Sequence, residues 1–199
     1  MSEAIQRESA LHGAVSRFVS SPGGGLKLTE RGHLGYVNLR GDASEPGFVD
    51  AVRSVLGVEL PCAANTVAEG GLHGVLWLGP DEWLVVTAPM AERGTANVLR
   101  TALAGRHVAV TEVGGGMTCI RLDGAPAREV LQRECPLDLH PKAFRAGQCA
   151  QSHLIKAPVL LRPLADGRVD LFVRRSFADY VWRWLVDAGA EFGVTATRE

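Results

Sequence analysis

The 199-residue sequence has little lysine and no long apolar run. Lysine occurs at Lys27, Lys142 and Lys156, and the remainder of the 21 basic residues are arginine. The 22 acidic residues bring the formal net charge to −1, which excludes a generic nucleic-acid binder and a highly charged disordered tail. No segment approaches the roughly 18 apolar residues of a membrane helix. The first residues lack the pattern of a secretory signal, so we expect a cytoplasmic protein.

Motifs for metal and nucleotide binding are missing as well. The four cysteines form no C-x-x-C pair, and no histidine stands at metal-ligand spacing from any of them. We therefore predict no metal site and four reduced thiols that pack in the core as small apolar side chains. Neither G-x-G-x-x-G nor G-x-S-x-G occurs. The run Gly114-Gly115-Gly116 lacks the Lys-Ser/Thr of a phosphate loop and is predicted to be a turn between strands.

Hydrophobic periodicity predicts the same order of elements twice: a strand, a helix, a hairpin and a second helix. The predicted elements are 34–39, 48–56, 75–87 and 95–103, followed by 117–122, 127–135, 154–173 and 177–188. Short segments correspond between the units, such as Arg40-Gly41 with Asp123-Gly124. We predict an α+β fold made by duplication, with one domain at 26–194 and pseudo-repeats at about 34–106 and 107–190.

Local signals define the predicted ends of several helices. Asp42 or Ser44 is predicted to cap the helix at 48–56, and Gly57 is predicted to end it. Ser176 is predicted to cap the last helix. The hairpin at 75–87 turns at Gly79-Pro80-Asp81-Glu82.

Residues 1–25 are predicted to form an N-terminal arm. The apolar pairs Ala10-Leu11, Ala14-Val15 and Phe18-Val19 recur at helical spacing, which indicates a short amphipathic helix. The following Ser, Pro and Gly residues interrupt regular structure. We expect the arm to find little to pack against in a lone chain and to dock on a partner in an assembly.

Two adjacent carboxylates are the first candidate functional residues. Asp81 and Glu82 lie in the hairpin turn between Trp77 and Trp83. An acid–base pair usually needs one desolvated and one solvated carboxylate, whereas a hairpin turn solvates both. Turn formation is therefore favoured over catalysis for Asp81 and Glu82. A ligand or partner contact that includes Trp77 remains the functional alternative, and we predict no catalytic residue.

The last predicted strand and helix carry a second candidate surface. Arg174 and Arg175 end the strand, where they either form a solvated edge or pair with a partner. Trp182 and Trp184 are two residues apart, roughly 200° around a helix axis, so at most one faces the core. The other is a candidate interface residue, because aromatic residues and arginine are enriched at interfaces.

Five segments occur in order over about residues 30–190. They are Asn38-Leu39-Arg40-Gly41, Leu56-Gly57-Val58-Glu59-Leu60-Pro61, Trp77-Leu78-Gly79-Pro80-Asp81-Glu82-Trp83-Leu84, Cys135-Pro136-Leu137-Asp138-Leu139 and Arg175-Ser176-Phe177-Ala178-Asp179-Tyr180. Together they resemble the gamma subunits of heterotetrameric sarcosine oxidase. At Thr111-Glu112-Val113-Gly114 the chain departs from the Asp-Val-Ser associated with the family.

The resemblance implies a fold and a set of partners. The fold would be similar to the folate-binding domain of the glycine-cleavage aminomethyltransferase. The complex would demethylate sarcosine to glycine oxidatively, with hydrogen peroxide as a product. This chain would be non-catalytic, bind no cofactor and pack on the alpha subunit, with beta and delta subunits also present. FAD, FMN, NAD and tetrahydrofolate would be held by the other subunits.

Two alternative functions remain open at this point. A related complex that demethylates another N-methyl amino acid would need a similar small subunit. A stand-alone tetrahydrofolate-binding protein would be an aminomethyltransferase-like enzyme, and Glu82 would then be the residue expected to contact the pterin. The departure at Glu112 and Gly114 weakens the prediction that this chain itself holds folate.

Overall fold

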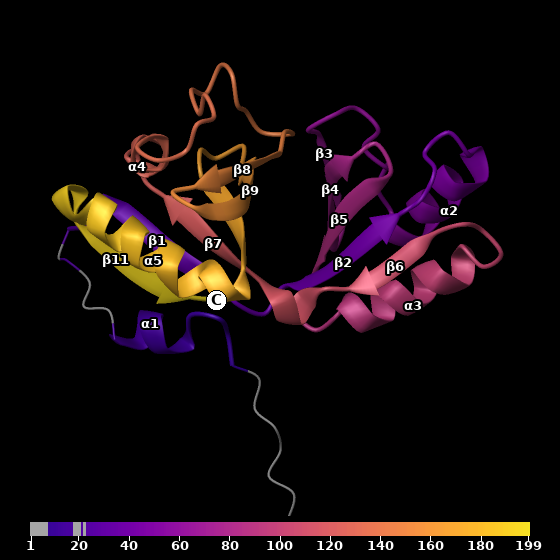
Figure 1. The fold of residues 1–199 in the computed structure, drawn as a ribbon, viewed down its shortest axis with the longest axis horizontal. Helices are drawn as coiled ribbons and strands as arrows, with labels where there is room; N and C mark the ends of the chain where they lie inside the picture. Colours follow the sequence, from indigo (N-terminus) through magenta and orange to yellow (C-terminus); the bar gives the residue numbers. More distant parts are fainter. Residues whose placement is uncertain (1–7, 18–20, 22) are drawn as a thin grey trace, which may run out of the picture.

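Strands that are apolar on both faces determine the layering of the protein. In the computed structural model, which describes residues 8–17, 21 and 23–199, β5 (Glu82–Thr87) and β10 (Val169–Arg174) are buried along nearly their whole lengths. Alternate residues of β10 face opposite sides: Leu171 packs with the helices, and Phe172 packs toward the other sheet. Both sheets therefore lie inside, with helices on the outer faces (Figure 1).

Within the described residues, one sheet has five strands and the other has six. The five-stranded sheet has the order β3 (Val67–Gly70), β4 (His73–Gly79), β5, β2 (Gly35–Arg40), β6 (Ala109–Glu112). The six-stranded sheet has the order β11 (Val194–Arg198), β1 (Leu26–Arg31), β7 (Met117–Asp123), β10, β9 (Ala157–Pro163), β8 (Ala150–Leu154). The helices are α1 (His12–Arg17), α2 (Pro46–Leu56), α3 (Glu92–Ala102), α4 (Ala127–Gln132) and α5 (Arg175–Gly189), with 3₁₀ turns η1 (Gly114–Gly116) and η2 (Ala190–Phe192).

The element order confirms the predicted duplication. The sequence β2, α2, β3, β4, β5, α3, β6 is followed by β7, α4, β8, β9, β10, α5, β11. The strand order β3-β4-β5-β2 in the first sheet corresponds to β8-β9-β10-β7 in the second. One strand breaks the correspondence: β1 lies between β7 and β11, antiparallel to β7 and parallel to β11. In the first unit, β6 pairs with β2 directly.

Some predicted elements have different ends in the structure. The strand predicted from residue 154 begins at Ala157 as β9, and the preceding strand β8 was not predicted. Ile155, which has a positive φ of 55°, lies in the turn between these two strands. The helix predicted at 95–103 is α3, which begins earlier, at Glu92.

Two predicted helix caps are wrong. Glu45 is the N-cap of α2, while Asp42 instead accepts hydrogen bonds from the backbone and side chain of Ser44. The predicted cap of α5 at Ser176 is also wrong, since Arg174 is the N-cap.

Three cysteines lie in the core as predicted, and Cys62 does not. Cys119, Cys135 and Cys149 are buried, whereas Cys62 is exposed, and all four are free thiols. Cys62 follows Pro61, whose carbonyl oxygen accepts a hydrogen bond from the indole of Trp83. This contact directs the loop backbone toward the core and leaves the next side chain on the surface.

The described part of the N-terminal arm packs on this chain, contrary to expectation. Leu11 is 1% exposed and belongs to the core that α4, α5 and the six-stranded sheet enclose. The buried carboxylate of Glu30 on β1 accepts hydrogen bonds from Ser9 Oγ (2.7 Å) and the Leu11 backbone N–H (2.9 Å). Both contacts fix the arm because a buried carboxylate needs hydrogen-bond donors. The predicted helical stretch at Phe18-Val19 lies outside the described residues.

We predict that Leu11→Ala lowers the free energy of unfolding by about 2 kcal/mol or more, because a buried leucine loses its apolar contacts and leaves a cavity. Urea unfolding followed by circular dichroism measures this change. Leu72→Ala is the matched control, since Leu72 is 75% exposed and should change stability by less than about 0.5 kcal/mol. An unfolding midpoint of Leu11→Ala equal to that of Leu72→Ala would show that the arm does not stabilise the domain.

Candidate functional site between the two sheets

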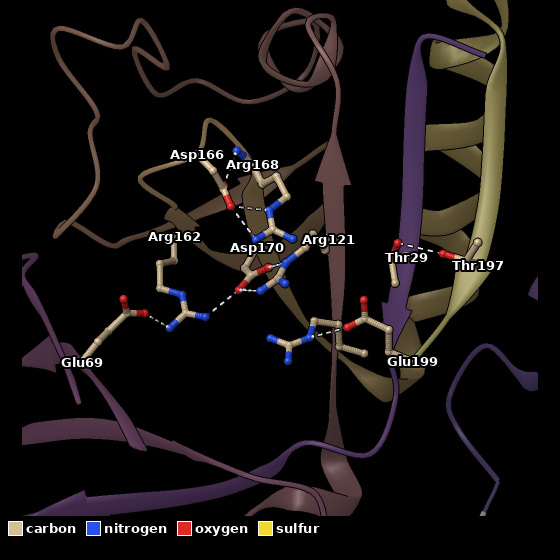
Figure 2. Close-up of polar contacts among 10 residues, drawn as sticks. Thr29, Glu69, Arg121, Arg162, Asp166, Arg168, Asp170, Thr197 and Glu199 are labelled. Carbon is tan, nitrogen blue, oxygen red and sulfur yellow. Dashed lines mark hydrogen bonds and ion pairs between the residues drawn. The ribbon is translucent and has the colours of Figure 1, made fainter. Parts of the chain in front are cut away.

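A row of three charged side chains crosses the six-stranded sheet on the face that meets the other sheet. Strand register places Asp170 on β10 directly opposite Arg121 on β7 and Arg162 on β9. Arg121 donates from Nε to Asp170 Oδ1 (2.6 Å) and from Nη2 to Oδ2 (3.0 Å). Arg162 Nη2 donates to Oδ2 (2.5 Å), so two guanidinium groups surround one carboxylate (Figure 2).

The same row connects the two halves of the duplicated domain. Arg162 Nη1 donates to Glu69 Oε1 on β3 of the five-stranded sheet (2.5 Å). The Arg162 guanidinium also lies over the ring of Phe172, with its carbon 5.5 Å from the ring centroid. Phe172 in turn packs edge-on against Tyr36 of β2, with centroids 6.1 Å apart. These contacts fix one sheet relative to the other.

The electrostatic environment keeps Asp170 ionised. Burial by itself raises the pKa of this carboxyl, but the hydrogen bonds and positive charges of Arg121 and Arg162 outweigh burial and hold its pKa below the ordinary value. The Asp170 side chain is fully buried, whereas Glu69 at the outer end of the network is about half exposed. The central ion pairs are therefore better shielded from solvent than the Arg162–Glu69 pair.

We predict that Asp170 makes stability depend on pH in the acid range. Its pKa is lower in the folded protein than in the unfolded chain, so its stabilising contribution is complete above the unfolded value of about 4 and disappears as pH falls through the folded value. Urea unfolding of the native chain and of Asp170→Asn between pH 7 and pH 3 tests this sign. The stability difference between them should shrink as pH falls, and a difference that grew would contradict it.

A small cleft lies beside this network, between the ends of strands from both sheets. Its volume is about 220 Å³, and its lining includes Asn38 and Glu82 from one sheet and Met117, Gln151 and Arg174 from the other. Asn38 Nδ2 donates to Glu82 Oε1 (2.7 Å), and Gln151 Nε2 donates to the Leu78 carbonyl across the cleft (2.7 Å). Apolar side chains form much of the remaining lining; they are Leu78, Leu84, Val113, Pro158, Val159, Leu160 and Phe172.

The adjacent carboxylates Asp81 and Glu82 lie in different environments in the structure. Asp81 pairs with Arg40 at 2.8 Å and lines a depression of the first half that His107 and Val108 also line. Glu82 instead faces the cleft between the sheets. Trp77 is half-buried against the core under α2 and α3. The predicted surface of Trp77, Asp81 and Glu82 is thus distributed over three environments.

The second predicted surface is also divided. Arg174 lines the cleft, while Arg175 donates from Nη1 to the backbone carbonyl of Glu8 (3.1 Å). Trp182 is 2% exposed in the core, so it is corrected from an interface candidate to a core residue. Trp184 is the partly buried member of the pair and remains the predicted interface tryptophan. As expected from their spacing, only one of the two is fully in the core.

The buried charge row was not predicted from the sequence, although a signal for it exists. Arg121, Arg162 and Asp170 each stand between two apolar residues inside a strand segment. Such residues are rarely buried unless they are paired. Glu112, at the position where the family pattern differs, pairs instead with α3: its carboxylate lies 3.5 Å from Arg100 and 3.7 Å from Arg93.

Among the residues that the structure describes, no group of three or more His, Cys, Asp and Glu side chains is arranged to hold a metal ion. No helix in this part of the chain has the length and apolar character needed to cross a membrane.

The duplicated fold defines the structural class. The glycine cleavage system aminomethyltransferase T from Bartonella henselae matches with a TM-score of 0.64 over 87% of this chain and 48% of that one. At 13% identity this match shows the fold alone, and it confirms the predicted aminomethyltransferase-like architecture.

The family follows from closer matches. A chain of the heterotetrameric sarcosine oxidase from Corynebacterium sp. U-96, solved with pyrrole 2-carboxylate, has a TM-score of 0.85 and 28% identity, covering 94% of this chain and 96% of that one. Sarcosine oxidase gamma subunits from Corynebacterium sp. (strain P-1) and Arthrobacter sp are 33% and 34% identical over 193 residues, which is 96% of this chain and 93% of each relative. The sequence model of the sarcosine oxidase, gamma subunit family matches residues 40–191. The chain belongs to this family.

Proposed function

We propose that this chain is a non-catalytic subunit of a cytoplasmic heterotetrameric sarcosine oxidase and packs directly on the alpha subunit, with beta and delta subunits completing the complex. The match to a chain of a heterotetrameric sarcosine oxidase over 94% of this chain carries the proposal. The complex would oxidise the N-methyl group of sarcosine and release glycine. Its FAD, FMN, NAD and tetrahydrofolate would be bound by the other subunits.

The geometry of this chain suits a structural role in such a complex. The buried row of Arg121, Asp170 and Arg162 fixes the Arg162 side chain, and the Arg162–Glu69 pair links the six-stranded sheet to the five-stranded sheet. A partner subunit therefore meets a surface that is already ordered, which reduces the entropy lost on association. In this proposal the chain contributes binding area and rigidity, while other subunits supply the redox chemistry.

Co-expression tests the proposal directly. When the chain is tagged and produced with the alpha, beta and delta subunits, affinity capture should yield all four chains at equal stoichiometry. The complex should produce hydrogen peroxide from sarcosine, whereas the isolated chain should not. A chain that remains monomeric when mixed with the alpha subunit would contradict the subunit role, and peroxide production by the isolated chain would contradict the non-catalytic role.

The cleft permits a test of the alternative tetrahydrofolate-binding function. Its volume of about 220 Å³ is below the roughly 300–1,000 Å³ of small-molecule pockets, and Asn38 already bonds the Glu82 carboxylate. These observations disfavour a pterin at Glu82. Calorimetry of the isolated chain with millimolar tetrahydrofolate should give no binding heat, and saturable binding that Glu82→Gln abolishes would support the alternative.

A further inference from the structure

Arg174 differs from most arginines of this protein because its guanidinium has no partner within the part of the chain that the structure describes. Among the arginines whose side chains the structure describes, all except Arg145 and Arg174 pair with a carboxylate or hydrogen-bond another group. Arg145 lies exposed in the loop before β8. Arg174 is also exposed, and it lines the cleft between the two sheets.

The position of Arg174 adds positive potential to this cleft. Arg174 ends β10 and is the N-cap of α5. Its guanidinium has only hydrogen-bond donors, so it cannot accept a bond from the N–H groups of the first helical turn. The first turn of the 15-residue helix α5 carries no acidic residue. The partial positive charge of the helix N-terminus is therefore added to that of the guanidinium rather than neutralised.

The remaining lining of the cleft limits what can bind beside Arg174. Met117, Phe172 and other apolar side chains offer an apolar wall, and Glu82 contributes a carboxylate. A ligand with several negative charges would be repelled by Glu82. A ligand with a single carboxylate, an aliphatic side chain and backbone N–H groups would fit all three parts of the lining. The carboxylate would pair with Arg174, the aliphatic side chain would pack on the apolar wall, and the N–H groups would donate to the Glu82 oxygens. A protein loop with an Asp or Glu supplies that combination.

We propose that this cleft is a docking site for a loop of another subunit of the complex, which places an acidic side chain on Arg174 and an apolar side chain beside Met117. The inference rests on the proposed function and specifies where and by what chemistry the subunits meet. The volume of about 220 Å³ suits a side chain with its flanking backbone. A guanidinium binds a carboxylate through two parallel hydrogen bonds, so Arg174 also fixes the orientation of the loop.

Competitive assembly tests the docking site. Two differently tagged copies of this chain, one native and one variant, are co-expressed with the other three subunits, and the ratio of tags in the purified complex is measured. Arg145→Gln is the matched control because it removes one exposed, unpaired guanidinium elsewhere on the chain. Urea unfolding and the ratio of tags in the soluble pool establish that each variant is folded and equally abundant.

The expected incorporation ratios separate the possible outcomes. Arg174→Gln should enter the complex about tenfold less often than the native chain, Arg174→Glu still less often, and Arg174→Lys to an intermediate extent, since lysine keeps the charge but not the paired hydrogen bonds. Arg145→Gln should compete equally. Equal incorporation of Arg174→Gln and the native chain would overturn the docking site while leaving the subunit role intact.

Two further results distinguish this proposal from its alternatives. Failure of the native chain itself to enter the complex would overturn the proposed function as well as the docking site. If Arg174→Gln incorporates normally but abolishes tetrahydrofolate binding by the isolated chain, the cleft is a small-anion site and not a protein interface.

Discussion

Asp170→Asn is expected to destabilise the isolated chain by about 3–5 kcal/mol, a large part of the roughly 5–15 kcal/mol that stabilises a typical domain. The substitution leaves Arg121 without the buried carboxylate that compensates its charge and leaves Arg162 with only the half-exposed carboxylate of Glu69. Removing one member of a buried ion pair is costly because the remaining charge has lost both water and its partner. Urea unfolding at pH 7 measures the change.

Two comparisons test the physical reason for this loss. Asp166→Asn changes a neighbouring aspartate that pairs with Arg168 at an exposed turn, and it should cost less than about 1 kcal/mol. Replacing the whole row together, with Arg121→Met, Asp170→Leu and Arg162→Met, should be less destabilising than Asp170→Asn alone. If the triple variant were much less stable than Asp170→Asn, the ion pairs of the row would stabilise the folded protein by more than the cost of burying their charges, contrary to this prediction.

Trp83→Ala is expected to lower the free energy of unfolding by about 3–5 kcal/mol, because a large aromatic side chain is removed from the core of the first half. Trp83 is fully buried, packs on Phe48 with ring centroids 5.7 Å apart and donates from Nε1 to the Pro61 carbonyl (2.8 Å). Urea unfolding followed by far-ultraviolet circular dichroism measures the loss without relying on tryptophan fluorescence.

Two more variants divide the contribution of Trp83 between packing and hydrogen bonding. Trp83→Phe keeps much of the aromatic packing but removes the donor to Pro61, so a loss of about 1–3 kcal/mol is expected. Trp184→Ala is the surface comparison, and it should cost less than Trp83→Ala because Trp184 is only partly buried. If Trp83→Ala and Trp184→Ala lowered the free energy of unfolding equally, the burial of Trp83 under α2 and α3 would not explain its contribution to stability.

Local signals made the order of elements predictable from the sequence. Gly57 ends α2 in the left-handed conformation, with φ of 69°, as the sequence predicts for a glycine at that position. The turn around Asp81 and Glu82 and the 3₁₀ turn at Gly114–Gly116 also lie where turn residues predicted them. These features depend on neighbours in sequence, so the residue types alone are informative.

Contacts between distant residues were not predictable in the same way. Strand register pairs Leu26 with Val194 and Lys27 with Asp123, and no local pattern specifies such pairings. The choice of Trp182 over Trp184 for the core depends on how α5 rests on the sheet, which periodicity left open. The cleft combines Glu82 and Arg174 from different halves, so its residues meet only through the fold.

The insertion of β1 between β7 and β11 has a consequence for how the chain folds during synthesis. The first half can form its sheet from β2 to β6 as soon as those residues leave the ribosome, because all of its strands are close in sequence. β1 is made earlier, but its neighbours β7 and β11 are made later. One edge of β1 therefore stays unpaired until β7 is made, and the edge that includes Leu26 and Leu28 stays open on the other side until β11 is made. In the nascent chain this unpaired strand edge is an aggregation-prone surface for as long as β11 is missing.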